Sequence, residues 1–278
     1  MPCFKITVAY DGTGYVGWQR QVNGVSIQGL LEDALRALDG RDVTVKGAGR
    51  TDAGVHALGQ VAAFTIDRVL PGGALVRALN ARLPDAIRVL SADEVPAAFH
   101  PRFGAREKTY RYRIWNGEVM SPFERRYAWH LVGALDVPAM QAAARLLEGR
   151  HDFTAFQAAG SATATGEREI MRSHVWKSFT TEDTEEEASS RPGLDLCVRR
   201  VLGGGELIWF ELTGTGFLRR MVRTIVGTLV EIGRGRQRVD WIGRVLASRD
   251  RATAGPTAPP EGLFLVRVAY GDALAANP

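Results

Sequence analysis

The chain has 278 residues, of which 45% are hydrophobic and 24% are charged. This composition is that of a globular protein and excludes a disordered or collagen-like chain. Lysine and arginine together number 35 against 31 acidic residues, giving a net charge of +4, and only four of the 35 are lysines. A mild excess of guanidinium groups is compatible with a nucleic-acid partner, although codon usage in a GC-rich genome explains it equally well.

Cysteine content and hydropathy exclude further classes of protein. Two cysteines, Cys3 and Cys197, are too few for a disulfide framework, and the five histidines show no spacing typical of metal ligands. No apolar run is long enough to cross a membrane, and the first residues lack the features of a signal peptide. We therefore expect a cytoplasmic protein with no metal, no other cofactor and no membrane anchor.

The first half of the chain alternates between strand-like and helix-like segments. Its clearest element is a helix whose apolar residues recur at helical spacing and whose N-cap is Ser26. The predicted elements are a strand near residues 3–10, a helix near 26–38, strands near 43–47 and 60–66, a helix near 72–83 and a strand near 86–94.

The second half repeats this order with an additional helix and strand. The predicted elements are a strand at 107–116, a helix at 137–148 that stops at Gly149, strands near 171–179, 194–201 and 206–213, helices near 216–232 and 238–248, and a strand at 263–270.

Both halves read β-α-β-β-α-β, which is the ferredoxin-like order. We therefore predict an α/β fold of two ferredoxin-like lobes, residues 1–105 and 106–278. Their strands would join into a mixed, mainly antiparallel sheet with helices on one face.

One segment of the second half differs in composition from the rest. Residues 180–193 are acidic, and their only apolar side chains are one alanine and one proline. Such a run is typical of a solvated loop, and its charge would repel RNA. We expect it to lie away from any nucleic-acid site.

The nonapeptide Gly49–Ala57 places the carboxylate of Asp52 two residues after the guanidinium of Arg50. An arginine can keep a carboxylate ionised and oriented, and the flanking glycines let the backbone approach a ligand. In isolation, Asp-x-Gly is usually an ordinary turn. The complete nonapeptide, however, resembles the signature Gly-Arg-Thr-Asp-x-Gly-Val-His-Ala of the tRNA pseudouridine synthase A family. The resemblance implies that Asp52 is the nucleophile.

Several other motifs between residues 10 and 270 resemble the same family. The resemblance of Lys108–Arg113 places Tyr110 in the active site, where an aromatic ring can stack on a flipped-out base. As candidate substrate-binding residues we take Tyr110, Trp18, Gln19, His56 and Phe217. The motifs are Tyr10–Gln19, Phe99–Phe103, Lys108–Arg113, Gly149–Phe153, Gly214–Arg223 and Thr257–Leu263.

Arg223 lies in an otherwise apolar helical pattern, where an unpaired guanidinium is costly. The family resemblance implies that Arg223 pairs with the catalytic Asp52. The alternative is an arginine whose charged end extends along its stem into solvent.

The resemblance implies an isomerase that converts uridine to pseudouridine at positions 38, 39 and 40 of the tRNA anticodon stem-loop. It also implies an RNA-binding cleft between the lobes, a homodimer, and a single catalytic aspartate without metal or cofactor. From the residues alone, Asp52 could attack C1′, attack the base or take a proton from the ribose.

Two other classes remain as alternatives. A non-catalytic RNA-binding module would share the basic surface but has no use for an aspartate held by arginines. A nucleoside hydrolase or glycosidase would need a second carboxylate near the first. The only dense acidic cluster, Glu182–Glu187, lies in the predicted solvated loop.

Overall fold

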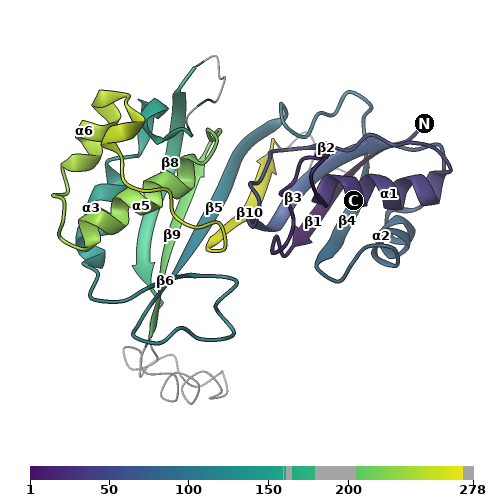
Figure 1. The fold of residues 1–278 in the computed structure, drawn as a ribbon. Helices are drawn as coiled ribbons and strands as arrows, with labels where there is room; N and C mark the ends of the chain where they lie inside the picture. Colours follow the sequence, from purple (N-terminus) through teal and green to yellow (C-terminus); the bar gives the residue numbers. More distant parts are fainter. Residues whose placement is uncertain (159, 161–164, 179–204, 272–278) are drawn as a thin grey trace, which may run out of the picture. The chain divides into compact units, whose positions relative to one another are not determined.

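The structure is a computed structural model that describes residues 1–158, 160, 165–178 and 205–271. The chain forms two compact units (Figure 1). Unit 1 contains Met1–Tyr110 and the chain from Phe264 onward, and unit 2 contains Arg111–Leu263.

Unit 1 is a small α/β unit. Its elements are β1 (Cys3–Tyr10), α1 (Ile27–Asp39), β2 (Lys46–Gly47), β3 (His56–Thr65), α2 (Gly72–Asn80), β4 (Ile87–Val95), the first part of β5 (Ala105–Asn116) and nearly all of β10 (Leu263–Tyr270). The strands pair in the order β4-β1-β3-β10-β5, and β2 pairs with β3. Strand β1 is antiparallel to both β3 and β4, and β2 is antiparallel to β3, so β4-β1-β3-β2 reproduces the ferredoxin-like order.

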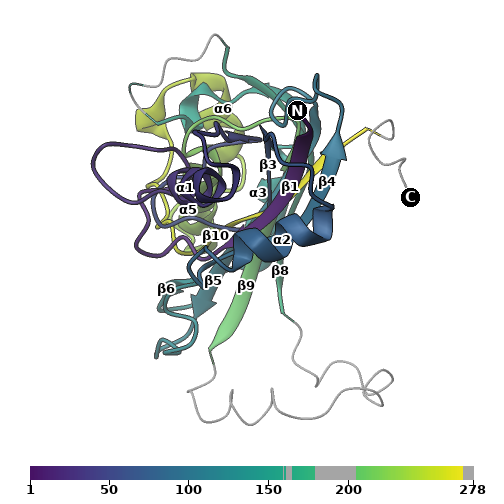
Figure 2. The ribbon, with the colours of Figure 1, turned by 90° about the vertical axis from the view of Figure 1, so that its right-hand side faces the viewer.

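Helix α1 shows why this unit folds as its sequence predicts. The Ser26 hydroxyl accepts a hydrogen bond from the backbone N–H of Gly29, and Gly40 ends the helix at a φ of 80°. The apolar stripe between them is buried and consists of Ile27, Leu31, Ala34, Leu35 and Leu38. Helix α2 contacts α1 and packs on β4, as Figure 2 shows from the side.

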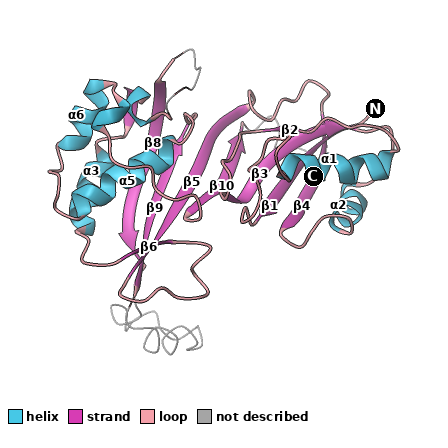
Figure 3. Cartoon of the chain, in the orientation of Figure 1, coloured by secondary structure: helices cyan, strands magenta, loops and turns pink. Residues whose placement is uncertain are grey.

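Unit 2 begins within β5, which therefore contributes residues to both units. Its other elements are β6 (Trp129–Leu131), α3 (Val137–Arg145), β7 (Gly149–Asp152), η1 (Thr154–Phe156), β8 (Glu167–Lys177), β9 (Glu206–Gly214), α5 (Met221–Gly233), α6 (Trp241–Ser248) and η2 (Arg251–Thr253). The strands pair in the order β5-β9-β8-β7, and β6 runs parallel to β5. Helix α3 packs on β8 and on α5 (Figure 3).

The α/β fold with a mixed, mainly antiparallel sheet is confirmed, and several details differ from the sequence prediction. The short strands β6 and β7 were not predicted, and Gly149 opens β7 instead of ending α3. The expected strand at 43–47 shrinks to β2. The expected strand at 194–201 and the acidic run at 180–193 lie outside the described residues.

Two differences have a clear physical cause. Helix α5 begins at Met221 and not at 216, because Arg220 adopts a left-handed φ of 61° that no α-helix contains. Strand β10, expected in the second half, groups with unit 1 because it pairs in parallel with β3, with Phe264 opposite His56. No helix in the described part of the chain has the length and hydrophobicity needed to span a bilayer.

Candidate active site

The loop that carries Asp52 joins β2 to β3 and rests on the motif Tyr10–Gln19. The backbone N–H of Trp18 donates to the carbonyl of Thr51 at 3.1 Å, and that of Gly54 donates to the carbonyl of Tyr15 at 3.3 Å. Gly17 has a φ of 100°, and a Cβ at this position would lie 2.5 Å from the carbonyl oxygen of Thr51. The two motifs thus form one structure, in which a glycine permits the close approach of their backbones.

Side chains hold the first residues of the same loop. Lys108 Nζ donates to the carbonyl of Ala48 at 2.7 Å, and Gln60 Nε2 donates to the carbonyl of Gly49 at 2.9 Å. Burial, with a smaller contribution from the charge of Arg102, lowers the pKa of Lys108 to about 8. The backbone leading to the carboxylate is therefore fixed by two donors, one of them a cation.

Asp52 is half-buried and lies within electrostatic range of the buried Tyr110. Burial is the main cause of the raised pKa of the Tyr110 hydroxyl, and the charges of Tyr10 and Asp52 raise it further. Tyr10 shares a 2.8 Å hydrogen bond with Thr51 Oγ1, and burial raises the pKa of Tyr10 to about 12. The loop therefore presents a carboxylate next to two phenols that stay protonated at neutral pH.

The predicted site residues Arg50 and Gln19 meet at the edge of this loop. Arg50 is exposed, and its Nε donates to Gln19 Oε1 at 3.0 Å. Gln19 Nε2 in turn donates to Gln28 Oε1 at 2.7 Å, and Gln28 Nε2 donates to the carbonyl of Val45. This chain of amides orients the guanidinium of Arg50. The pairing of Arg50 with Asp52 stays a prediction.

Trp18 and His56, predicted to bind substrate, are both buried within unit 1. Trp18 is 2% exposed and its ring lies 6.2 Å from that of Tyr10. His56 is 1% exposed, stacks on Phe264 at 4.7 Å, and accepts a hydrogen bond at Nδ1 from the backbone N–H of Gly12 at 3.0 Å. Both side chains support the Asp52 loop in this arrangement, and their contact with a nucleotide stays a prediction.

In unit 2, Arg223 of α5 is anchored by the motif Thr257–Leu263. Its Nε donates to the carbonyl of Ala258 at 2.7 Å, and its own carbonyl accepts from the backbone N–H of Ala258 at 3.0 Å. A Cβ on Gly227 would lie 1.7 Å from the carbonyl oxygen of Pro256, so this segment packs directly on the helix backbone. The pairing of Arg223 with Asp52 joins residues of different units and stays a prediction.

Phe217 precedes α5 and is half-buried. A Cβ on Gly214 would lie 3.4 Å from its ring, which therefore covers the end of β9. Its role in substrate binding stays a prediction.

Three residues that shape the Asp52 loop were not predicted from the sequence, namely Tyr10, Gln60 and Lys108. The sequence did indicate a site position for Lys108, because it lies two residues before Tyr110 and so on the same face of the strand. Tyr10 opens a motif already assigned to the site. Nothing in the sequence around Gln60 indicates that its side chain turns toward Gly49.

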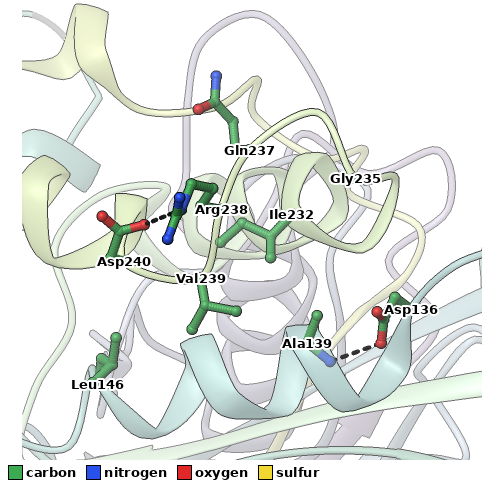
Figure 4. A pocket seen from close by; sticks show the side chains of 9 residues that line it. All are labelled: Asp136, Ala139, Leu146, Ile232, Gly235, Gln237, Arg238, Val239 and Asp240. Atoms are coloured by element: carbon green, nitrogen blue, oxygen red, sulfur yellow. Dashed lines mark hydrogen bonds and ion pairs between the residues drawn. The ribbon is translucent and has the colours of Figure 1, made fainter.

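A cavity of about 620 Å³ lies in unit 2 between α3 and the turn from α5 to α6 (Figure 4). It contains none of the predicted site residues. Three of its charged side chains have partners: Arg238 lies 3.6 Å from Asp240, and Asp136 caps α3 by accepting from the N–H of Ala139. No cluster of potential metal ligands is present among the residues that the structure describes.

A single carboxylate on a rigid loop, beside protonated tyrosines and on a ferredoxin-like sheet, is suited to an enzyme that works with one acidic group. Comparison with known proteins defines the class. A family model described as tRNA pseudouridine synthase matches residues 6–104 and 143–271.

Relatives match over almost the whole chain. The protein is 47% identical over 272 residues to a tRNA pseudouridine synthase A of Myxococcus xanthus, covering 98% of this chain and 93% of that protein. Proteins with the same description from Moorella thermoacetica and Geotalea uraniireducens are 45% and 44% identical, over 97% and 96% of this chain and 100% and 98% of their own lengths. The chain belongs to the tRNA pseudouridine synthase family, which confirms the resemblance seen in its motifs.

Proposed function

We propose that the protein converts uridine to pseudouridine in tRNA, with Asp52 as the single catalytic carboxylate. The observation that carries this proposal is the Asp52 loop, whose backbone is held by Lys108 and Gln60 and whose carboxylate lies beside the buried Tyr110. Family membership supports the reaction, and the rigid loop supports the residue. A carboxylate that must meet a sugar or base at one angle benefits from such a fixed backbone.

The reaction breaks the bond between N1 of uracil and C1′, turns the base, and forms a bond between C5 and C1′. A carboxylate can begin it by attacking C1′, by attacking the base, or by removing a ribose proton. In each case Asp52 has to be ionised, and the positive charges of Arg223 and Arg50 would favour that form. The C5 proton leaves last and needs an acceptor.

Tyr110 is the residue that we assign to the detached uracil. Its ring can stack on the base, and its hydroxyl is protonated at neutral pH, as in any tyrosine; burial and nearby negative charge raise its pKa further. A neutral phenol can relay a proton by accepting one at oxygen while giving up its own. Gln19 and Phe217 remain candidate contacts to the nucleotide.

For the substrate we propose uridines at positions 38, 39 and 40 of the anticodon stem-loop. Bases in a stem are reached by flipping, while arginines bound to phosphates set the register of the RNA. We further propose a homodimer that binds one tRNA across both subunits, working in the cytoplasm where tRNA is matured. The arginine-rich composition supports a polyanionic partner.

Incubation of the purified protein with unmodified tRNA, without added metal, tests the proposal. Nucleoside analysis should find pseudouridine, and a transcript with cytidine at positions 38 to 40 should yield none. Free uracil would indicate a hydrolase, and unchanged tRNA would indicate a binding module. Pseudouridine formed in both transcripts would retain the reaction and reject the positions.

A further inference from the structure

Phe103 is an apolar ring on the outside of unit 1. It lies in the loop between β4 and β5 and is 78% exposed. Exposing a phenyl ring is unfavourable, and single exposed rings are common enough to need no function by themselves. What distinguishes this ring is how firmly the loop around it is built.

The loop from Phe99 to Gly104 is organised around His100. The His100 carbonyl accepts from the N–H of Gly104 at 2.9 Å, and its Nδ1 accepts from the N–H groups of Arg102 and Phe103 at 3.2 and 3.3 Å. Tyr270 Oη donates to the carbonyl of Pro101 at 2.8 Å and so ties the loop to β10. The exposed ring is therefore held in place before any partner arrives.

Two neighbours also fix the orientation of the ring. The imidazole of His100 lies 4.4 Å from the Phe103 ring, and the guanidinium carbon of Arg102 lies 5.7 Å from its centre. A cation close to an aromatic ring is attracted by its π-electrons. Even with these two neighbours, the side chain of Phe103 stays 78% exposed.

The charges around Phe103 favour a polyanion. Arg102 and Arg106 are exposed, and the one acidic residue nearby in sequence, Glu107, is neutralised by Arg267 at 2.6 Å. Protein partners bind apolar patches larger than one ring, and the residues around Phe103 are cationic, so a protein partner is disfavoured. RNA offers both an aromatic base and phosphates.

The Phe103 loop adjoins the Asp52 loop. Arg102 acts electrostatically on Lys108, and the Nζ of Lys108 is bonded to the carbonyl of Ala48, four residues before Asp52. The two loops are thus linked through Lys108.

We propose that Phe103 is a stacking platform for an unpaired base of the substrate RNA, with Arg102 and Arg106 contacting the phosphates on either side of that base. The inference rests on the proposed function for the identity of the RNA, and it adds a binding subsite outside the catalytic loop. Aromatic rings beside arginines bind unpaired bases in this way, and the stacking tolerates any base.

Substitutions that keep or remove the aromatic surface test this role. Phe103→Leu keeps an apolar side chain but removes the ring, and it should weaken binding of an unmodified tRNA transcript about tenfold. Phe103→Trp keeps a stacking surface and should bind as tightly as wild type. The matched control is Phe123→Leu, which removes another exposed ring (76% exposed) and should change affinity less than twofold.

A second measurement identifies the base. Transcripts with one abasic nucleotide at each unpaired position of the anticodon loop should include one that binds wild type about tenfold more weakly. The same transcript should show no further loss with Phe103→Leu, because ring and base then share one interaction. Equal binding of wild type and Phe103→Leu, or loss of affinity with Phe103→Trp equal to that with Phe103→Leu, would overturn the proposal.

The outcomes separate this inference from the proposed function. If wild type forms no pseudouridine in tRNA, the proposed function fails, whatever the binding data show. If wild type forms pseudouridine while all Phe103 variants bind tRNA normally, only the stacking platform fails. Melting temperatures of the variants should match wild type, since the substituted ring is exposed.

Discussion

The Asp52 loop of unit 1 and helix α5 of unit 2 hold their charged residues in different ways. Asp52 sits on a loop that other segments fix through its backbone, by hydrogen bonds to the carbonyls of Ala48, Gly49 and Thr51. Arg223 sits on a regular helix, and its own side chain is fixed by the carbonyl of Ala258.

The difference fits the roles that we propose for the two charges. A reacting carboxylate has to meet its target at one angle, and a fixed backbone helps to set that angle. A guanidinium that stabilises another charge can give one N–H to a carbonyl, because that bond orients the group without neutralising it. Each unit thus supplies a charge in a fixed position. Substitutions in both units show whether anchoring through the backbone and anchoring through the side chain are equally important.

Apart from substitution of Asp52 itself, the largest effect should come from Arg223→Ala. If Arg223 is the charge partner of Asp52, removing it should lower turnover on the order of a thousandfold, since an unpaired buried charge is costly. Stability should fall by about 1–3 kcal/mol because the buried carbonyl of Ala258 loses its donor. Turnover assays and urea unfolding measure the two effects, with the exposed Arg244→Ala as control. Normal turnover in Arg223→Ala would remove Arg223 from the site.

Gly227→Ala should destabilise unit 2 by about 3 kcal/mol. Its Cβ would lie 1.7 Å from the backbone oxygen of Pro256. That oxygen cannot move without lifting the chain around Pro256 and Ala258 away from α5. Gly243→Ala in α6 is the matched control, since nothing lies within 4 Å of its Cβ, and there alanine should stabilise by roughly 0.5–1 kcal/mol. Chemical denaturation compares the two. Equal effects in both helices would mean that the chain around Pro256 does not pack tightly on α5.

Tyr110→Phe should slow turnover about tenfold or more with little change in tRNA affinity, because a proton relay needs the hydroxyl while stacking needs only the ring. Tyr110→Ala should in addition weaken binding. Single-turnover rates and tRNA affinity distinguish the roles. Full activity of the phenylalanine variant would leave Tyr110 a stacking role only, and full activity of the alanine variant would exclude it from the site.

The smallest effect concerns Lys108 and pH. Burial lowers the pKa of Lys108 from 10.5 to about 8, so between these pH values the unfolded chain binds more protons than the folded chain. Stability contributed by this residue therefore rises with pH from about 8 upward. Compared with Lys108→Met, wild type should gain in urea midpoint between pH 7 and 9.5, before tyrosines ionise. Parallel pH curves for the two proteins would show that Lys108 titrates normally.

Elements with a strong local signal were predictable from the sequence. Helix α1 combines a cap at Ser26, an apolar stripe and a terminal glycine, and its predicted bounds agree with the structure to within a residue at each end. Strand β7 has the polar sequence Gly149–Asp152 and forms because its backbone pairs with β8, which no local pattern reveals. The start of α5 was missed because the left-handed Arg220 depends on tertiary packing.

The candidate site was predictable as a set of motifs but not as a set of contacts. The motifs pointed to the Asp52 loop and to Tyr110, whose hydroxyl lies within electrostatic range of Asp52. They could not show that Trp18 and His56 face inward, since burial depends on how distant segments pack. They also gave no hint that the backbone of the loop is held by Gln60.

The central claim is that Asp52 is the catalytic carboxylate of a tRNA pseudouridine synthase. The most direct test is Asp52→Asn, assayed for pseudouridine in unmodified tRNA and for tRNA affinity, with the exposed Asp67→Asn as control. We expect no detectable turnover and an affinity within about threefold of wild type, because phosphate contacts supply most of the binding. Turnover of Asp52→Asn within tenfold of wild type would contradict the claim.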